Sequence, residues 1–201
     1  MERAVSRIVL GAIAPVSLFL LGWWGTLGLL GDSPMIPWAA LGGLALGLVL
    51  DVTVLWRRLD SLFAVSMATQ TAIAVFYGIM IFGFFMGFPV PVLLVGLGWG
   101  FAVAHASDRP VDVRARRVRV ASVGSALIMS IACCATAWLA FSEPTIAAQV
   151  RGMLGLSFTP SIGALAASSV VGGVVLVGLA YGIPVMLAAR PRTPRGSVGA
   201  V

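Results

Sequence analysis

One acidic residue lies inside an otherwise apolar stretch of this sequence. Asp51 stands in the run from Ile36 to Trp56, about one and a half helical turns before its end. An ionisable group inside a membrane costs roughly 2.5–3.5 kcal/mol on insertion scales, so it normally faces a bundle interior or a water-filled cavity. Asp51 is therefore the first candidate for a functional group. Snorkelling toward the cytoplasm or pairing with Arg57 or Arg58 is the structural alternative.

Polar side chains on two further apolar segments could share a site with Asp51. Ser66 and Gln70 are four residues apart and share a helix face, and Thr69 is adjacent to Gln70. His105 ends another apolar segment, on the same predicted side as Asp51. A carboxylate and an imidazole can relay protons or bind a cation. We predict a cytoplasm-facing vestibule lined by Asp51, Gln70 and His105. The alternatives are that His105 lies at headgroup level and that Gln70 bonds a neighbouring helix.

Residue patterns of several enzyme classes are missing from the sequence. It contains one histidine and no lysine, which rules out bis-histidine haem ligation and a lysine Schiff base. It has no His-Glu-x-x-His, Gly-x-Ser-x-Gly or Walker motif. Cys133 and Cys134 are adjacent, point about 100° apart on a helix, and are predicted to be small packing residues. We expect no metal site, any cofactor is left unknown by the sequence, and an enzyme acting on lipid is the least favoured function.

The composition of the chain predicts an integral membrane protein. Of the 201 residues, 60% are hydrophobic and 10% are charged, whereas a soluble domain has about 25% charged residues. Because a spanning helix needs roughly 20 apolar residues, we predict an all-α, polytopic bundle over residues 1–189 and a disordered tail over 190–201. The six predicted spans are Ile8–Leu30, Ile36–Trp56, Leu62–Phe85, Val90–Ala106, Val120–Phe141 and Ser161–Ala189. They could pair as three helical hairpins.

Arginine is distributed unequally between the two sides of this bundle. All but one of the arginines fall at the N-terminus, after the second span, in the stretch Asp108–Arg119 and in the tail, and only Arg151 falls on the other side. This bias predicts a cell-membrane protein with both termini in the cytoplasm. It also explains the net charge of +6 without nucleic acid, because arginines gather at anionic headgroups. The predicted headgroup contacts are Arg114, Arg116, Arg117 and Arg119.

The segment Ser142–Thr159 is too polar and too interrupted by glycine to cross the membrane, and the surface helix expected within it covers Pro144–Leu156. We predict a short helix on the outer surface, with Ser142 as its N-terminal cap.

Small residues recur at four-residue spacing in the second, fourth and sixth spans. The spacing places them on one helix face, where neighbouring backbones can approach closely. They are Gly43 and Gly47, Gly96 and Gly100, Ser168 and Gly172, and Ser169 and Gly173. Packing inside the bundle, a homo-oligomer interface and a partner subunit all fit this pattern. Two functions follow as hypotheses: a small transporter or channel with the polar vestibule, or a non-catalytic subunit of a larger membrane complex.

Overall fold

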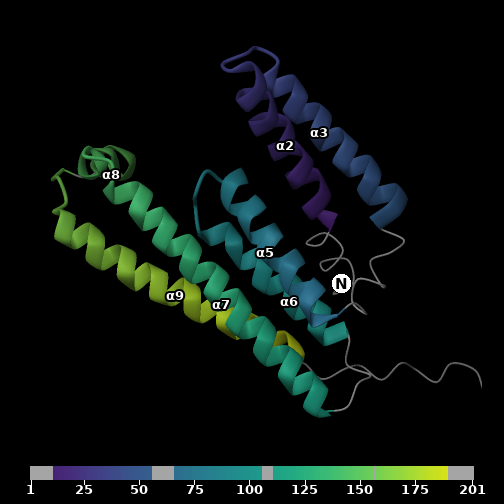
Figure 1. The fold of residues 1–201 in the computed structure, drawn as a ribbon. Helices are drawn as coiled ribbons and strands as arrows, with labels where there is room; N and C mark the ends of the chain where they lie inside the picture. Colours follow the sequence, from purple (N-terminus) through teal and green to yellow (C-terminus); the bar gives the residue numbers. More distant parts are fainter. Residues whose placement is uncertain (1–10, 56–65, 106–110, 156, 190–201) are drawn as a thin grey trace, which may run out of the picture.

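The computed structural model describes residues 11–55, 66–105, 111–155 and 157–189, and these residues form helices and no strands (Figure 1). The N-terminal pair is α2 (Ile13–Leu30) and α3 (Ile36–Leu50), which continues into a π-helical turn, η1 (Asp51–Leu55). Next come α5 (Met67–Phe84), a 3₁₀ turn, η2 (Val90–Val92), and α6 (Leu93–His105). The chain ends with α7 (Val111–Phe141), α8 (Ile146–Leu154) and α9 (Ile162–Ala189).

Five of the described helices are long and apolar enough to cross a membrane. They are Ile13–Leu30, Ile36–Val54, Met67–Phe84, Val113–Phe141 and Ile162–Ala189. These helices account for five of the six predicted spans and indicate a membrane protein. The tail 190–201 and the segments 56–65 and 106–110 lie outside the described residues.

The remaining predicted span, Val90–Ala106, is shorter as a helix than the sequence suggested. Its α-helical part has 13 residues, or about 20 Å at 1.5 Å per residue, against a hydrocarbon core of about 30 Å. Prolines at positions 89 and 91 accompany the 3₁₀ turn that precedes it. α6 is also the most enclosed helix, because Val95, Trp99 and Val103 are all buried among α5, α7 and α9. Protein rather than lipid covers most of its surface.

Two helical groups make up the fold. α2 and α3 form a tight antiparallel hairpin, and α2 then packs on α5 (Figure 1). α6, α7 and α9 pack on one another, and α5 joins them through a shared core. The centre of that core contains Tyr77, Ile81, Val95, Trp99 and Met129.

α7 is longer than predicted. The expected span began at Val120, but the helix begins at Val111 and has 31 residues, which makes it about 46 Å long. The arginine-rich stretch before Val120 is therefore the first part of this helix. The apolar part of α7 needs about 20 residues to span the membrane, so the arginines lie on the helical extension beyond it.

α8 matches the predicted surface helix in place, but the predicted cap is wrong. The helix begins at Ile146 with Thr145 at its N-cap. The Ser142 hydroxyl donates instead to the Trp138 carbonyl oxygen, at 2.7 Å. Ser142 therefore belongs to the end of α7. Its hydroxyl is held by the carbonyl four residues earlier in that helix and does not cap α8.

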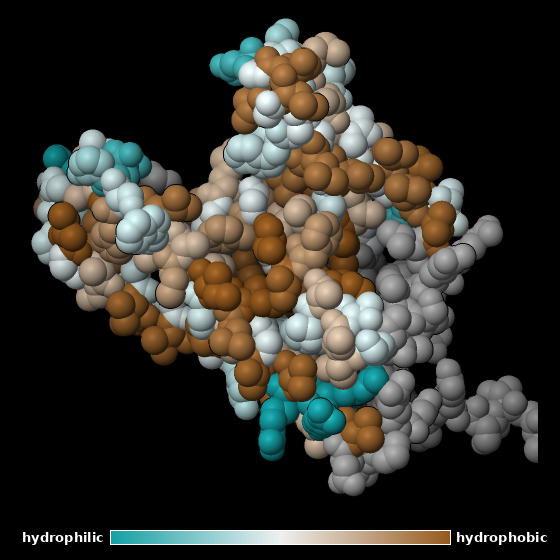
Figure 2. Space-filling view, in the orientation of Figure 1, coloured by the Kyte–Doolittle hydropathy of each residue, from teal (hydrophilic) through white to brown (hydrophobic). Residues whose placement is uncertain are grey.

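The outer surface of the described helices is largely apolar. Large side chains such as Leu29 (86% exposed), Ile131 (69%) and Val174 (67%) are uncovered on the flanks of different helices. Figure 2 shows these hydrophobic flanks between hydrophilic patches near the helix ends. An apolar flank between two polar ends is the surface expected of helices in a bilayer.

Candidate functional site

Asp51 is buried in the seam between α2 and α3. Only 9% of its surface is exposed, and it begins the π-helical turn η1. Its Oδ1 atom has no hydrogen-bond partner among the described residues. Gly11 faces it so closely that a Cβ at position 11 would lie 2.6 Å from Oδ2. A buried carboxylate oxygen without a partner, in a helix geometry that is frequent at functional sites, makes Asp51 the centre of the candidate site.

A series of close contacts places Asp51 in this seam. Along α3, Ala39, Gly43, Gly47 and Asp51 follow one another at four-residue steps and share a face. Because the two helices are antiparallel, the residues of α2 that face this series follow in the reverse order along the sequence. A Cβ at Gly43 would come under 3.0 Å from the Leu18 backbone.

The neighbouring steps of the series are equally close. A Cβ at Gly47 would collide with the Pro15 backbone, and a Cβ at Gly22 would collide with Ala39. The absence of side chains lets the two backbones approach, and the helical period then directs Asp51 at Gly11 rather than at lipid. The spacing Gly43–Gly47–Asp51 is visible in the sequence and could have predicted this register.

Ser66 and Thr69 lie at the start of α5. Ser66 is the N-cap, and its hydroxyl oxygen accepts from the Thr69 backbone N–H at 3.2 Å. The two hydroxyl oxygens are 2.9 Å apart. Both residues are exposed. Capping accounts for their polar groups, since it satisfies backbone donors that the first turn leaves open.

Gln70 and His105 lie on other helices than Asp51. Gln70 is buried on α5, with 6% of its surface exposed. α3 packs mainly on α2, and α2 packs on α5, so α2 lies between the helices that carry Asp51 and Gln70 (Figure 1). His105 is the last residue of α6, and its side chain is outside the described part of the structure. The vestibule that would join the three residues stays a prediction.

The core holds polar groups that sequence reasoning missed. Tyr77 on α5, Trp99 on α6, and Ser122 and Ser125 on α7 are all buried. Their hydroxyl or indole N–H groups have no partner within the part of the chain that the structure describes. A Cβ at Gly124 would come under 3.0 Å from the Trp99 ring. Ser122 and Ser125 are three residues apart in the helix that also carries Cys133 and Cys134. That spacing could have indicated from the sequence that polar groups lie on the buried face of this helix.

The four candidate headgroup arginines occupy different surroundings on α7. Arg116 and Arg119 are exposed, whereas Arg117 is buried with 6% of its surface accessible. An Arg114 guanidinium N–H donates to the carbonyl oxygen of Ala188 on α9. Arg114 and Arg119 also line a pocket between α7 and α9. These arginines are therefore not equivalent.

The small-residue pairs also have different surroundings. A Cβ at Gly96 would lie 3.3 Å from the Ala180 carbonyl oxygen, and one at Gly100 would lie 3.0 Å from the Pro184 Cα. These glycines face α9. A Cβ at Gly172 would meet nothing within 4 Å, and one at Gly173 would meet only the Cys133 Cβ, at 3.8 Å, among the described residues. Gly96 and Gly100 therefore pack inside the bundle. Gly172 and Gly173 lie on a face of α9 that other described residues leave largely uncovered.

Among the residues that the structure describes, no group of three or more His, Cys, Asp or Glu side chains is placed to hold a metal ion. Comparisons with protein-family models, with curated proteins and with solved structures found no match to this chain. The class that the long apolar helices indicate is a helical membrane protein. Within that class, the burial and contacts of Asp51 are what indicate a function.

Proposed function

We propose that this protein is a small transporter or channel for protons or small monovalent cations, with Asp51 as the group that binds them. The observation that carries the proposal is a buried carboxylate inside a candidate span, with one oxygen lacking a partner among the described residues. Burying an unpaired charge is costly. A proton or a small cation at the carboxylate removes that cost, so the site favours a positively charged ligand.

The immediate surroundings of Asp51 support this role. Gly11 leaves one side of the carboxylate without a side chain. The π-helical turn Asp51–Leu55 changes the hydrogen-bonding register where α3 ends, and such turns are frequent at functional sites. Oxygen atoms near a carboxylate are the ligands that a hard cation prefers.

The arginine distribution supports a topology for this transporter. With both chain ends in the cytoplasm, Asp51 lies in the cytoplasmic half of its span, because the next residues of that segment in sequence lead to Arg57 and Arg58. The ligand would then enter from the cytoplasmic side. Gln70 and His105 are the residues we propose next along the route.

The test uses the full-length chain in proteoliposomes that contain a trapped pH-sensitive dye. Potassium and valinomycin set an inside-negative potential, and proton influx is recorded. A second series imposes a Na⁺ gradient and records Na⁺ uptake. We expect flux through the wild-type protein and a loss of most of it in Asp51→Asn. Asp32→Asn is the matched control, because Asp32 is exposed in the turn between α2 and α3.

Two outcomes contradict the proposal. One is Asp51→Asn flux equal to that of the wild type, with both proteins eluting as the same folded species. The other is wild-type flux no higher than that of empty vesicles for both ions.

A second candidate function has its own observation. Ser168, Ser169 and Gly172 on α9 are exposed, and the Gly172 position is open. Small residues at four-residue spacing can seat a second helix. We therefore propose, as the alternative, a subunit that contacts another copy or another membrane protein through this face. Purification in mild detergent separates the two functions, since a stoichiometric partner and an absence of flux favour the subunit.

A further inference from the structure

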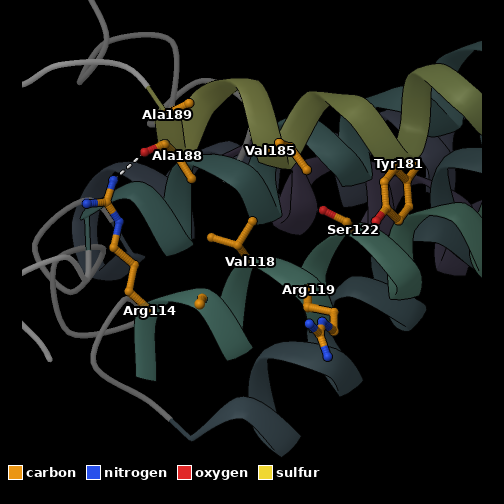
Figure 3. A pocket seen from close by; sticks show the side chains of 9 residues that line it. Arg114, Val118, Arg119, Ser122, Tyr181, Val185, Ala188 and Ala189 are labelled. Atoms are coloured by element: carbon orange, nitrogen blue, oxygen red, sulfur yellow. Dashed lines mark hydrogen bonds between the residues drawn. The ribbon is translucent and has the colours of Figure 1, made fainter. Parts of the chain in front are cut away.

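A groove lies between α7 and α9, which pack on each other, near the arginine-rich end of α7. Its volume is about 540 Å³. The residues from α7 recur at the helical period, and so do those from α9, so each helix contributes one face. The lining residues are Arg114, Ala115, Val118, Arg119, Ser122, Tyr181, Val185, Ala188 and Ala189 (Figure 3).

The chemistry of the groove changes along its length. Arg114 is at one end, where its guanidinium donates to the last turn of α9 at Ala188 (Figure 3). Val118 and Val185 form apolar walls in the middle, and Ser122 and Tyr181 lie further along (Figure 3). A guanidinium has five N–H donors, so the bond to Ala188 fixes the side chain and leaves other donors for a ligand. Arg119 adds a second positive charge at the side of the groove.

Ser122 lies in the wall of the groove on α7. Its side chain is fully buried, with 0% exposed, yet it lines the groove. Its hydroxyl oxygen has no hydrogen-bond partner among the described residues. A buried hydroxyl without a partner costs roughly 1–3 kcal/mol. Because none of its surface is accessible even in the empty groove, Ser122 is part of the wall behind the lining and not a contact for a ligand.

We infer that this groove binds one anionic phospholipid. The phosphate lies at Arg114, with Arg119 adding positive charge at the side, the glycerol and ester oxygens come next, and an acyl chain follows the walls at Val118 and Val185 toward Tyr181. From Arg114 to Ser122 is eight residues, or about 12 Å along the helix. The headgroup layer is about 5–7 Å deep on each side of the hydrocarbon core. The groove is therefore long enough to hold a headgroup and the first part of its chains.

Charge and apolar area together select this ligand. Free phosphate would use the arginines but would leave the walls at Val118 and Val185 uncovered. A zwitterionic lipid would cover the walls but would bring a cationic group close to two arginines, which is unfavourable. An anionic lipid satisfies both parts.

The test is native mass spectrometry of the full-length protein from micelles that contain equimolar phosphatidylglycerol and phosphatidylcholine. We expect the wild type to retain one phosphatidylglycerol in preference to phosphatidylcholine. Arg114→Gln should weaken that retention about tenfold, the loss expected when one charge-assisted hydrogen bond is removed. Arg119→Gln should weaken it less. Arg116→Gln is the matched control, because Arg116 is on the same stretch of α7 and does not line the groove.

A second pair of variants tests the apolar walls with every charge in place. Val185→Trp should block retention by filling the groove. Val174→Trp should leave it unchanged, because Val174 is an exposed residue of α9 away from the groove. Equal losses in Arg114→Gln and Arg116→Gln would overturn the inference, since they would indicate diffuse attraction to headgroups. Displacement of the lipid by millimolar inorganic phosphate, or retention that Val185→Trp does not change, would also overturn it.

Discussion

The Asp51 carboxylate lies against Gly11, with no room between them for a methyl group. A Cβ at position 11 would be 2.6 Å from Oδ2 and 3.1 Å from the carboxylate carbon. Because real Cβ atoms do not approach oxygen so closely, any larger residue at position 11 must displace the carboxylate or separate α2 from α3. This pair therefore links the packing of the hairpin to the proposed ion site.

Gly11→Ala should disturb the site without removing the carboxylate. We expect proton or Na⁺ flux to fall well below that of the wild type, because the added methyl group moves Asp51 or occupies the space of its ligand. Flux in the proteoliposome assay is the measurement. Gly25→Ala on α2 is the control, since a Cβ there would meet nothing within 4 Å among the described residues. Similar flux in Gly11→Ala and Gly25→Ala would count against the site.

Gly43→Ala should destabilise the α2–α3 hairpin. A Cβ there would come under 3.0 Å from the Leu18 backbone, and overpacking of this kind costs about 1–3 kcal/mol. The adjacent variant Gly42→Ala should be neutral or stabilising by up to about 1 kcal/mol, because alanine favours helices over glycine and that position is open. Unfolding in mixed detergent micelles compares the two. A Gly42→Ala protein that is less stable than Gly43→Ala would contradict the register of the hairpin.

Ser66→Ala should affect stability and leave flux intact. Loss of this N-cap removes the acceptor of the Thr69 backbone N–H and should cost about 1 kcal/mol. Gln70→Ala provides the contrast, because Gln70 is buried on the same helix and we propose it for the transport route. A drop in flux per folded protein for Ser66→Ala, with Gln70→Ala unaffected, would reverse these two assignments.

Gly172→Leu should test the uncovered face of α9. The position is exposed and open among the described residues, so the fold of the single chain should tolerate leucine. If α9 seats a partner helix, the variant should elute from size exclusion in mild detergent at a smaller size than the wild type. Unchanged elution and unchanged flux would mean that this face contacts only lipid.

Most of the helix positions could be predicted from the sequence, because apolar length depends only on local composition. The length of α6 could not, since enclosure by α5, α7 and α9 removes the need to match the bilayer thickness. The start of α7 at Val111 lies before the predicted span, because apolar length marks where a span begins and an arginine-rich stretch lacks it, although arginine is a good helix former. The topology of six spans and the cytoplasmic location of the termini stay predictions.

The candidate site was predictable in its central residue and not in its surroundings. Asp51 was identifiable because a charge in an apolar segment is rare. Its partner Gly11 depends on how α2 and α3 pack, and side-chain volume at a helix crossing is a property of two segments together. For the same reason, the sequence could not separate Asp51 from Gln70 by an intervening helix, nor place Trp99 against Gly124.

The most direct test of the central claim is ion flux through Asp51→Asn in proteoliposomes, beside the wild type and Asp32→Asn at equal amounts of folded protein. Asparagine keeps the shape of the side chain and removes the charge that would bind a proton or a cation. We expect Asp51→Asn to lose most of the flux and Asp32→Asn to keep it. Wild-type flux in Asp51→Asn would show that the buried carboxylate takes no part in transport.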